Sequence, residues 1–305
     1  MKLGESVIEE LWFAEDDDDE SSDQAAESFA ASLGRTTGLK AFPQVAQKII
    51  ALMQHPNCRT SDISRAVEED PALAAGLLRV ANSAFFAHAK AASSVQQAIV
   101  RLGLAQVKEI VYSVATMGMF KDVGGYGKSV RDHCAATGAL VQYIARDVAP
   151  AHEDGLFLCG LLHDIGKLML INSGEIDYPA DKIETVLAPD NVHIFEREEL
   201  GYDHAVLAGH IIAAWNMEDK ISKVVAWHHQ PSRAFKDEEI GPMVALLRIA
   251  DKLDFEMSRE DENFEVFLKN LENSSDCQYL QLKEGWLMKH WEDLYKLRLE
   301  SLSMF

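Results

Sequence analysis

The sequence predicts an all-α protein, and two observations carry that prediction. Apolar residues recur at helical spacing along most of the chain from residue 42 onward; Val45, Ile49 and Leu52, for example, fall on one helix face. No segment shows the convincing alternation of apolar and polar residues that predicts a half-buried strand. The composition, 48% hydrophobic and 26% charged over 305 residues, is typical of a globular protein that can bury a core.

The first 35 residues form an acidic segment that we expect to be flexible. Residues 1–27 hold eleven acidic side chains against one basic side chain, within a chain whose formal charge is −20. The run from Glu15 to Glu20 repels itself and cannot pack, although the apolar residues at 7–13 leave open a short amphipathic docking segment. This charge argues against direct nucleic-acid binding and against binding to an anionic membrane.

The sequence also predicts a cytoplasmic protein with no membrane segment. Its N-terminus lacks the basic stretch and the apolar core of a signal peptide, and no later window holds ~18 uninterrupted apolar residues. The four cysteines, at positions 58, 134, 159 and 277, form no CxxC motif, which indicates reduced thiols.

The helical part divides into two subdomains and a C-terminal extension. A glycine-rich cluster at residues 123–127 interrupts the helical pattern and places a boundary there. We therefore expect one helical subdomain at 36–122, a second at 128–255, and terminal helices in an extension at 256–305. Within the second subdomain, helical patterns run through 129–147, 154–170, 204–215, 219–229 and 241–254.

Two aromatic residues follow a well-defined helix in the first subdomain. This helix is expected to begin at Pro71, because Asp70 before it suits an N-cap, and to end at the polar Asn82. Phe85 and Phe86 come next. They either close the contact with the second subdomain or form an exposed site for a partner, and burial is the commoner fate of large apolar side chains.

His163 and Asp164 close an apolar run in the 154–170 pattern. A carboxylate beside an imidazole on a buried helix is costly, because it loses its hydration unless a charged group pairs with it. A divalent cation is the natural partner for the two side chains.

Further histidines and one aspartate could complete such a site. Asp251 lies in an apolar helix, and aspartate is rarely buried without a partner. His133 or His204 taken alone is more often a satisfied core or surface residue, so the prediction depends on the whole set. The candidate metal ligands are His133, His163, Asp164, His204, His228, His229 and Asp251. Imidazole mixed with carboxylate favours one or two divalent ions, iron or manganese first, with zinc or nickel as alternatives.

Several segments together resemble the HDOD domain family. They are Phe42-Pro43-Gln44-Val45-Ala46-Gln47-Lys48-Ile49-Ile50, Glu69-Asp70-Pro71-Ala72-Leu73-Ala74, Leu77 to Phe86, Ala98 to Leu104, Gly160-Leu161-Leu162-His163-Asp164-Ile165-Gly166-Lys167, Gly201-Tyr202-Asp203-His204 and Trp227-His228-His229. The likeness covers about residues 38–255. It implies a bacterial-type signalling protein in which an N-terminal helical subdomain packs on an HD-type subdomain.

The resemblance also implies roles for individual residues. HDOD proteins are related to the HD superfamily of metal-dependent phosphohydrolases, whose H…HD…D pattern maps onto His133, His163, Asp164 and Asp251. The additional histidines of the HD-GYP phosphodiesterases map, in order, onto His204, His228 and His229. Two departures disfavour cyclic di-GMP as a substrate: Ser129 stands where those relatives have a glutamate ligand, and no GYP triplet follows the histidine doublet.

Two functions follow from the resemblance, since many HDOD proteins lack the catalytic ligands and act as signalling modules. The first is a regulatory module whose metal site is structural or senses a ligand, and whose partner is an unidentified signalling protein. The second is an active phosphohydrolase for a nucleotide or a similar phosphoester. In that case Asp164 bridges or orients the ions and Lys167 grips a phosphate, although Lys167 could equally be a surface lysine at a helix end.

Overall fold

The computed structural model describes residues 42–53, 55, 57–83, 85–86, 91–120, 126–176, 178, 188–189, 191–259 and 263–305. These residues form helices and no strand, which confirms the all-α prediction. The helices are α3 (Gln44–Met53), α4 (Thr60–Glu68), α5 (Pro71–Ala81), α6 (Val95–Met119), α7 (Gly127–Val148), the 3₁₀ turn η1 (Pro150–His152), α8 (Leu156–Leu162), α9 (Ile165–Ser173), α11 (Val192–Leu200), α12 (His204–Ala214), α13 (Asp219–Ala226), α14 (Pro231–Ala234), α15 (Ile240–Arg259), α16 (Phe264–Glu272), α17 (Ser275–Tyr279) and α18 (Trp286–Ser301). The expected acidic segment at 1–35 lies outside the described residues.

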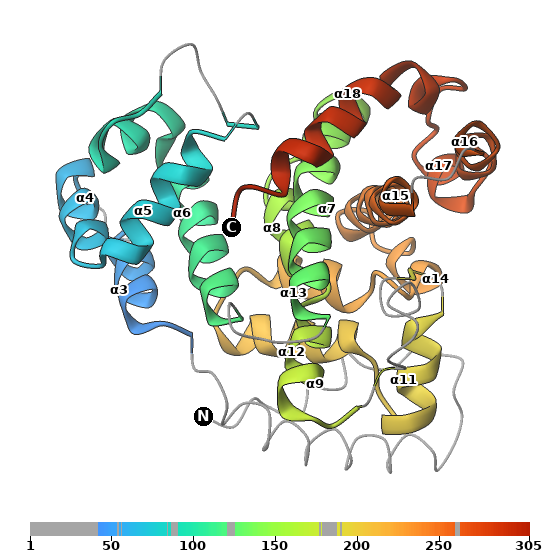
Figure 1. Cartoon of the computed structure of the whole chain (residues 1–305), viewed down its shortest axis with the longest axis horizontal. Helices are drawn as coiled ribbons and strands as arrows, with labels where there is room; N and C mark the ends of the chain where they lie inside the picture. The colour runs from blue at the N-terminus through green and yellow to red at the C-terminus, as the bar shows by residue number, and fades with distance from the viewer. Residues whose placement is uncertain are drawn as a thin grey trace.

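The first subdomain contains α3 to α6, at the left of Figure 1. α5 begins as predicted, because the Asp70 side chain accepts two backbone N–H groups of the first turn and Pro71 occupies the first helical position. It also ends as predicted. The side-chain amide of Asn82 donates to the carbonyl oxygen of Ala92 and accepts from its N–H group, at 2.9 and 2.7 Å.

α6 includes Gly118, one residue before its end at Met119. A glycine costs a helix only ~1 kcal/mol, which burial of neighbouring residues such as Met117 outweighs. The irregular residue is Gly103, whose φ of +77° is a left-handed conformation that only glycine adopts without strain and that kinks α6.

α7 runs through the second subdomain and packs against α8, α15 and α18 (Figure 1). Two glycines allow α7 and α8 to approach closely, since a Cβ added to Gly160 would lie 2.6 Å from the Cα of Gly138. This contact brings the helix that carries His133 against the helix that ends just before His163.

The predicted helix at 154–170 is in fact two helices, α8 and α9, which meet at His163 and Asp164. Asp164 has φ −104° and ψ 9°, outside the α-helical region. The Nδ1–H of His163 donates to the carbonyl oxygen of Gly160 at 2.7 Å. Consecutive residues of one helix point about 100° apart, so the break lets both adjacent side chains reach the same site.

One described stretch, Leu156–Ser173, has the length and mean hydropathy of a membrane span. Of this stretch, 83% is buried inside the protein. The break at Asp164 divides it, and buried core helices pass the same test of length and composition.

Phe85 and Phe86 lie at the contact between the two subdomains. Their rings meet the ring of Phe157 on α8 at centroid distances of 5.5 and 5.4 Å, Phe85 stacked and Phe86 edge-on. The expected closure of this contact is therefore confirmed. A salt bridge of 2.7 Å between Lys108 of α6 and Glu218 before α13 adds a polar contact between the same two parts.

The C-terminal extension contains α16, α17 and α18, as the helical spacing of its apolar residues predicts. α18 packs along α7 (Figure 1), where the Nε1–H of Trp286 donates to Asp147 Oδ2 at 2.5 Å. α15 continues to Arg259 because Glu256 and Met257 are still buried, so the expected limit at 255 falls inside a helix. The other domain limits remain predictions.

Candidate metal centre

The first cluster joins α7, the α8–α9 junction and α15. His133 Nε2 lies 3.2 Å from His163 Nε2 and 3.2 Å from Asp251 Oδ1. Asp164 Oδ2 lies 3.6 Å from His133 Nε2 and 3.5 Å from His163 Nε2. All four side chains are at most 4% exposed, so nitrogen and oxygen atoms converge here out of reach of bulk water.

The second cluster joins the start of α12 to the segment that follows α13. His204 Nε2 lies 3.1 Å from His229 Nε2 and 3.0 Å from Asp164 Oδ1. His204, His228 and His229 offer ligand nitrogens that all lie within 4.8 Å of one another. His204 and His228 are buried, and His229 is partly exposed.

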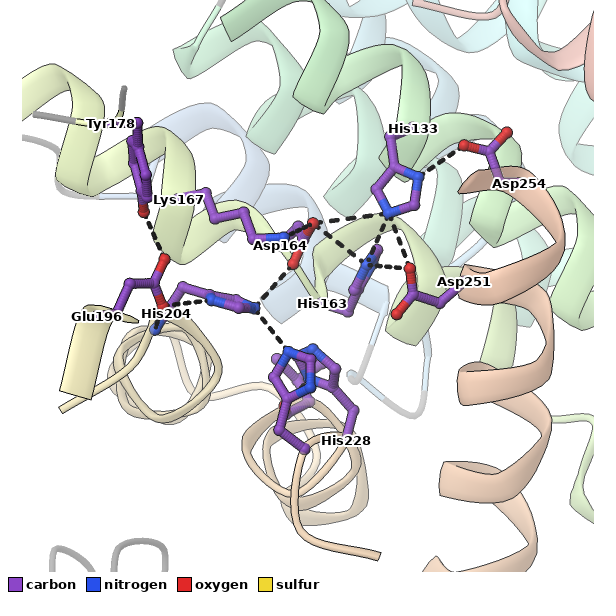
Figure 2. A network of polar contacts seen from close by, with 12 residues as sticks. His133, His163, Asp164, Lys167, Tyr178, Glu196, His204, His228, Asp251 and Asp254 are labelled. Atoms are coloured by element: carbon purple, nitrogen blue, oxygen red, sulfur yellow. Dashed lines mark hydrogen bonds and ion pairs between the residues drawn. The ribbon is translucent and has the colours of Figure 1, made fainter. Parts of the chain in front are cut away.

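Asp164 lies between the two clusters (Figure 2). Its Oδ2 faces His133 and His163, and its Oδ1 faces His204. The structure thus brings all seven candidate ligands into one buried region, grouped in two clusters that share a carboxylate.

The outer ring nitrogen of four histidines is occupied, which turns the other nitrogen inward. Nδ1 is bound to Asp254 Oδ2 in His133 (2.6 Å), to the Gly160 carbonyl in His163 (2.7 Å), to Glu196 Oε2 in His204 (2.5 Å) and to the Val225 carbonyl in His228 (2.6 Å). An acceptor at Nδ1 requires a proton there, so each neutral ring keeps its lone pair on Nε2. Metal-binding histidines show the same arrangement, which fixes the tautomer and the ring orientation.

Each cluster contains one histidine that carries a positive charge in the metal-free protein. Burial lowers the pKa of His133, but hydrogen bonds to Asp251 and Asp254 outweigh it and raise this pKa to about 10. Burial also lowers the pKa of His204, and the carboxylates of Glu196 and Asp164 raise it to about 9. His163, His228 and His229 have lowered pKa values because burial disfavours their charged forms.

The donor set fits divalent cations. Within the described part of the chain, His228 Nε2 is buried and has no hydrogen-bond partner, an arrangement that is costly unless another group uses the lone pair. Histidine nitrogens with carboxylate oxygens suit iron, manganese, zinc and nickel. An ion at each cluster would take the place of the proton held by His133 or by His204.

Lys167 is buried rather than on the surface. It is 2% exposed, in the first turn of α9, and its Nζ donates to Asp164 Oδ2 at 2.7 Å. Burial lowers the pKa of Lys167, but the nearby Asp164 outweighs it and raises this pKa. The expected continuous helix is absent, and Lys167 reaches the clusters through the shared carboxylate.

Several residues of the site were not predicted from the sequence. Asp254 follows Asp251 by three residues, so helical spacing alone could have placed both on one face. Glu196 lies on α11 in a charged stretch that gives no sign of burial, yet it is 0% exposed and also accepts from Tyr178. His193 stacks on His229 at a centroid distance of 4.1 Å, and nothing in the sequence pairs these two residues.

The fold and the paired clusters define an all-α protein built around a buried group of histidines and aspartates. The family model described as the HDOD domain matches residues 39–231, more than half of the chain. The protein belongs to the HDOD family.

Solved structures share this fold. An HDOD domain protein of unknown function from Geobacter sulfurreducens is 17% identical, with a TM-score of 0.67 over 91% of this chain and 99% of that chain. A protein from Shewanella amazonensis SB2B, named provisionally as a phosphohydrolase, is 21% identical, with a TM-score of 0.67 over 90% and 97%. A second protein from that organism, named provisionally as a metal-dependent phosphohydrolase, is 18% identical, with a TM-score of 0.58 over 91% and 99%. At these identities the likeness shows the fold alone.

Among curated proteins, an uncharacterized protein of Treponema pallidum (strain Nichols) is 25% identical over 222 residues. The match covers 69% of this chain and 41% of that protein. The chain therefore spans about two fifths of the length of this relative.

Proposed function

We propose that this HDOD protein is a cytoplasmic regulatory protein whose second subdomain binds two divalent metal ions. The inward orientation of the Nε2 atoms around Asp164 carries the proposal. His133, His163, Asp164 and Asp251 would hold one ion, and Asp164, His204, His228 and His229 the other. Iron or manganese suits this mixture of nitrogen and oxygen ligands.

A regulatory role is supported by where the ligands are attached. The clusters draw residues from α7, the α8–α9 junction, α12, the segment after α13 and α15, so metal occupancy would influence how these helices pack. His163 follows α8, the helix whose Phe157 contacts Phe85 and Phe86 of the first subdomain. A change at the centre would thereby reach the surface that the first subdomain presents to a signalling partner.

A second candidate function is phosphoester hydrolysis, favoured by the carboxylate that the two clusters share. Two-metal phosphoesterases use paired sites of this kind, where bound divalent cations activate water and offset phosphoryl charge. In this chain Lys167 would hold Asp164 in place, and its remaining N–H groups could reach a phosphate. A nucleotide or similar phosphoester would approach from the side on which His229 is partly exposed.

Metal analysis of the purified full chain tests the proposal. We expect close to two equivalents of iron or manganese, falling to close to one in Asp251→Asn and in His229→Gln, which each remove a ligand from one cluster. A screen of the metal-loaded chain against bis-p-nitrophenyl phosphate and cyclic dinucleotides distinguishes the two functions. No metal in the chain as purified, together with no uptake from manganese or iron solutions, would contradict both.

A further inference from the structure

The C-terminal extension reaches the first cluster through a partly buried ion pair. Arg298 of α18 donates from Nε to Asp254 Oδ1 at 2.8 Å. The other oxygen of Asp254 accepts from His133 Nδ1 at 2.6 Å. Asp254 is 2% exposed, so both of its oxygens are used, one by the extension and one by a metal-ligand histidine. We call this arrangement the Arg298 link.

A separate contact reaches the second cluster. Asp276 of α17 is 0% exposed and accepts from Arg248 Nε at 2.8 Å. Arg248 Nη1 in turn donates to the backbone carbonyl oxygen of His228 at 2.7 Å. We call this arrangement the Asp276 link. The Arg248 guanidinium thereby binds the backbone of the doublet His228-His229.

The two links each hold one group of the site. α13 ends at Ala226, so the backbone carbonyl of His228 lies outside that helix and accepts from Arg248 instead. The buried ring of His133 is oriented by the contacts of its Nε2 and by the bond of its Nδ1 to Asp254, the carboxylate that Arg298 holds. Arginine suits both tasks, because its planar guanidinium presents several N–H donors in a rigid geometry.

We propose that the C-terminal extension positions the two metal clusters independently, Arg298 acting on the first through Asp254 and Asp276 acting on the second through Arg248. The inference rests on the proposed function. The family model ends at residue 231, so none of these four residues lies in the stretch that defines the family. They are positioning residues, and α17 and α18 are the parts of the chain through which the affinity of each cluster is set.

Manganese titration of the metal-free full chain, followed by calorimetry, tests the two links separately. The His229→Gln background reports on the first cluster and the Asp251→Asn background on the second. In the first background, Arg298→Gln should weaken manganese binding about tenfold, the effect usual for an outer partner of a ligand histidine, and Asp276→Asn should leave it unchanged. In the Asp251→Asn background, Asp276→Asn should weaken manganese binding about tenfold, and Arg298→Gln should leave it unchanged.

Conservative and control variants separate positioning from general destabilisation. Arg298→Lys keeps the charge and one donor, so it should recover part of the lost affinity. Arg146 lies on α7, as His133 does, and its Nε contacts Glu153 at 2.9 Å at a more exposed position. Arg146→Gln removes this contact and should leave both affinities unchanged. Thermal unfolding in chelator identifies variants that fail to fold. If Arg298→Gln fails to fold, the double variant Arg298→Gln/Asp254→Asn replaces it, because it removes the buried carboxylate that the single substitution leaves unpaired. The first cluster of the double variant should still bind manganese weakly.

Equal weakening of both clusters by one substitution, or no weakening by either, would overturn the two-link proposal. A parent chain that takes up no manganese would contradict the proposed function instead. In that case the Nδ1 proton resonance of His133 in the metal-free chain decides the Arg298 link. Arg298→Gln should shift this resonance and Asp276→Asn should not; an unshifted resonance in Arg298→Gln would refute the link.

Discussion

His133 and His163 face each other through their Nε2 atoms at 3.2 Å, while the Nδ1 atom of each is engaged elsewhere. Two neutral rings in this arrangement would direct lone pairs at each other, so a proton or a cation must lie between them or beside them. In the metal-free chain a proton on His133 meets this requirement, and Asp251 accepts from the same nitrogen.

Metal should therefore stabilise the folded chain. At a free manganese concentration one hundred times the dissociation constant of a cluster, the free energy of unfolding should rise by about 2.7 kcal/mol per occupied site. Chemical denaturation with manganese and with chelator measures the difference. The double variant Asp251→Asn/His229→Gln should show little of this increase, and a full increase in that variant would place the bound metal elsewhere.

Asp164→Ala should destabilise the chain even in chelator. The substitution leaves the buried ammonium of Lys167 without its carboxylate partner, and breaking a buried ion pair from one side costs about 3–5 kcal/mol. Replacing both residues, as Asp164→Ala/Lys167→Met, should recover much of the loss. Equal unfolding free energies for Asp164→Ala and the parent would show that Lys167 does not depend on this carboxylate. Asp251→Asn is accordingly the better variant for separating lost activity from lost stability.

Gly166→Ala should disturb the second cluster more than the first. An added Cβ at Gly166 would lie 2.1 Å from the carbonyl oxygen of His204, and a backbone atom cannot move aside as a side chain can. Forcing atoms into a packed region costs about 1–3 kcal/mol, and manganese affinity at the second cluster should fall. Gly118→Ala is the matched control, because nothing lies within 4 Å of the added Cβ and alanine favours a helix. Unchanged affinity in Gly166→Ala would indicate that α9 can shift without moving His204.

Glu109, at the contact between the subdomains, should make stability depend on pH. Burial and the nearby Asp154 raise the pKa of Glu109 to about 7, against the N–H of Gly155, which lowers it. A carboxyl group whose folded pKa lies above its unfolded value near 4.5 stabilises the fold below pH 4.5, and this contribution is lost as the pH rises through 7. Glu109→Gln should thus raise the melting temperature at pH 8 and change it little at pH 4.5. The surface substitution Glu69→Gln should show no such dependence, and a melting temperature lowered at pH 8 by Glu109→Gln would contradict the assignment.

The helices and the candidate metal ligands could be predicted from the sequence to different degrees. Apolar spacing located most helices, because a buried helical face imposes a period on the residues themselves. The candidate ligands stood out because His163 and Asp164 are adjacent polar residues at the end of an apolar run. The break between α8 and α9 was not predicted, since neither proline nor glycine stands at His163 or Asp164 and the cause of the break is tertiary.

Only some of the residues that hold the candidate ligands in place could be predicted from the sequence. Asp254 lies about one helical turn after Asp251, so helical spacing could have predicted that both side chains face the site. Glu196 stands among charged neighbours and looks solvated, because only its contact with His204 makes it a buried residue. Arg298 and Asp276 lie 44 and 28 residues from Asp254 and Arg248, and no local pattern indicates pairs so far apart.

Because Asp164 serves both clusters, two ions bound there would be thermodynamically coupled. The first ion to bind would fix the Asp164 carboxylate that the second ion requires. The two ions would then share the single negative charge of this carboxylate. By linkage, each ion would change the affinity for the other by the same factor. A favourable coupling would make the centre fill within a narrow range of metal concentration, so the protein could report a threshold in metal supply. An unfavourable coupling would spread binding over a wide range of metal concentration, in which a form with one bound ion would persist.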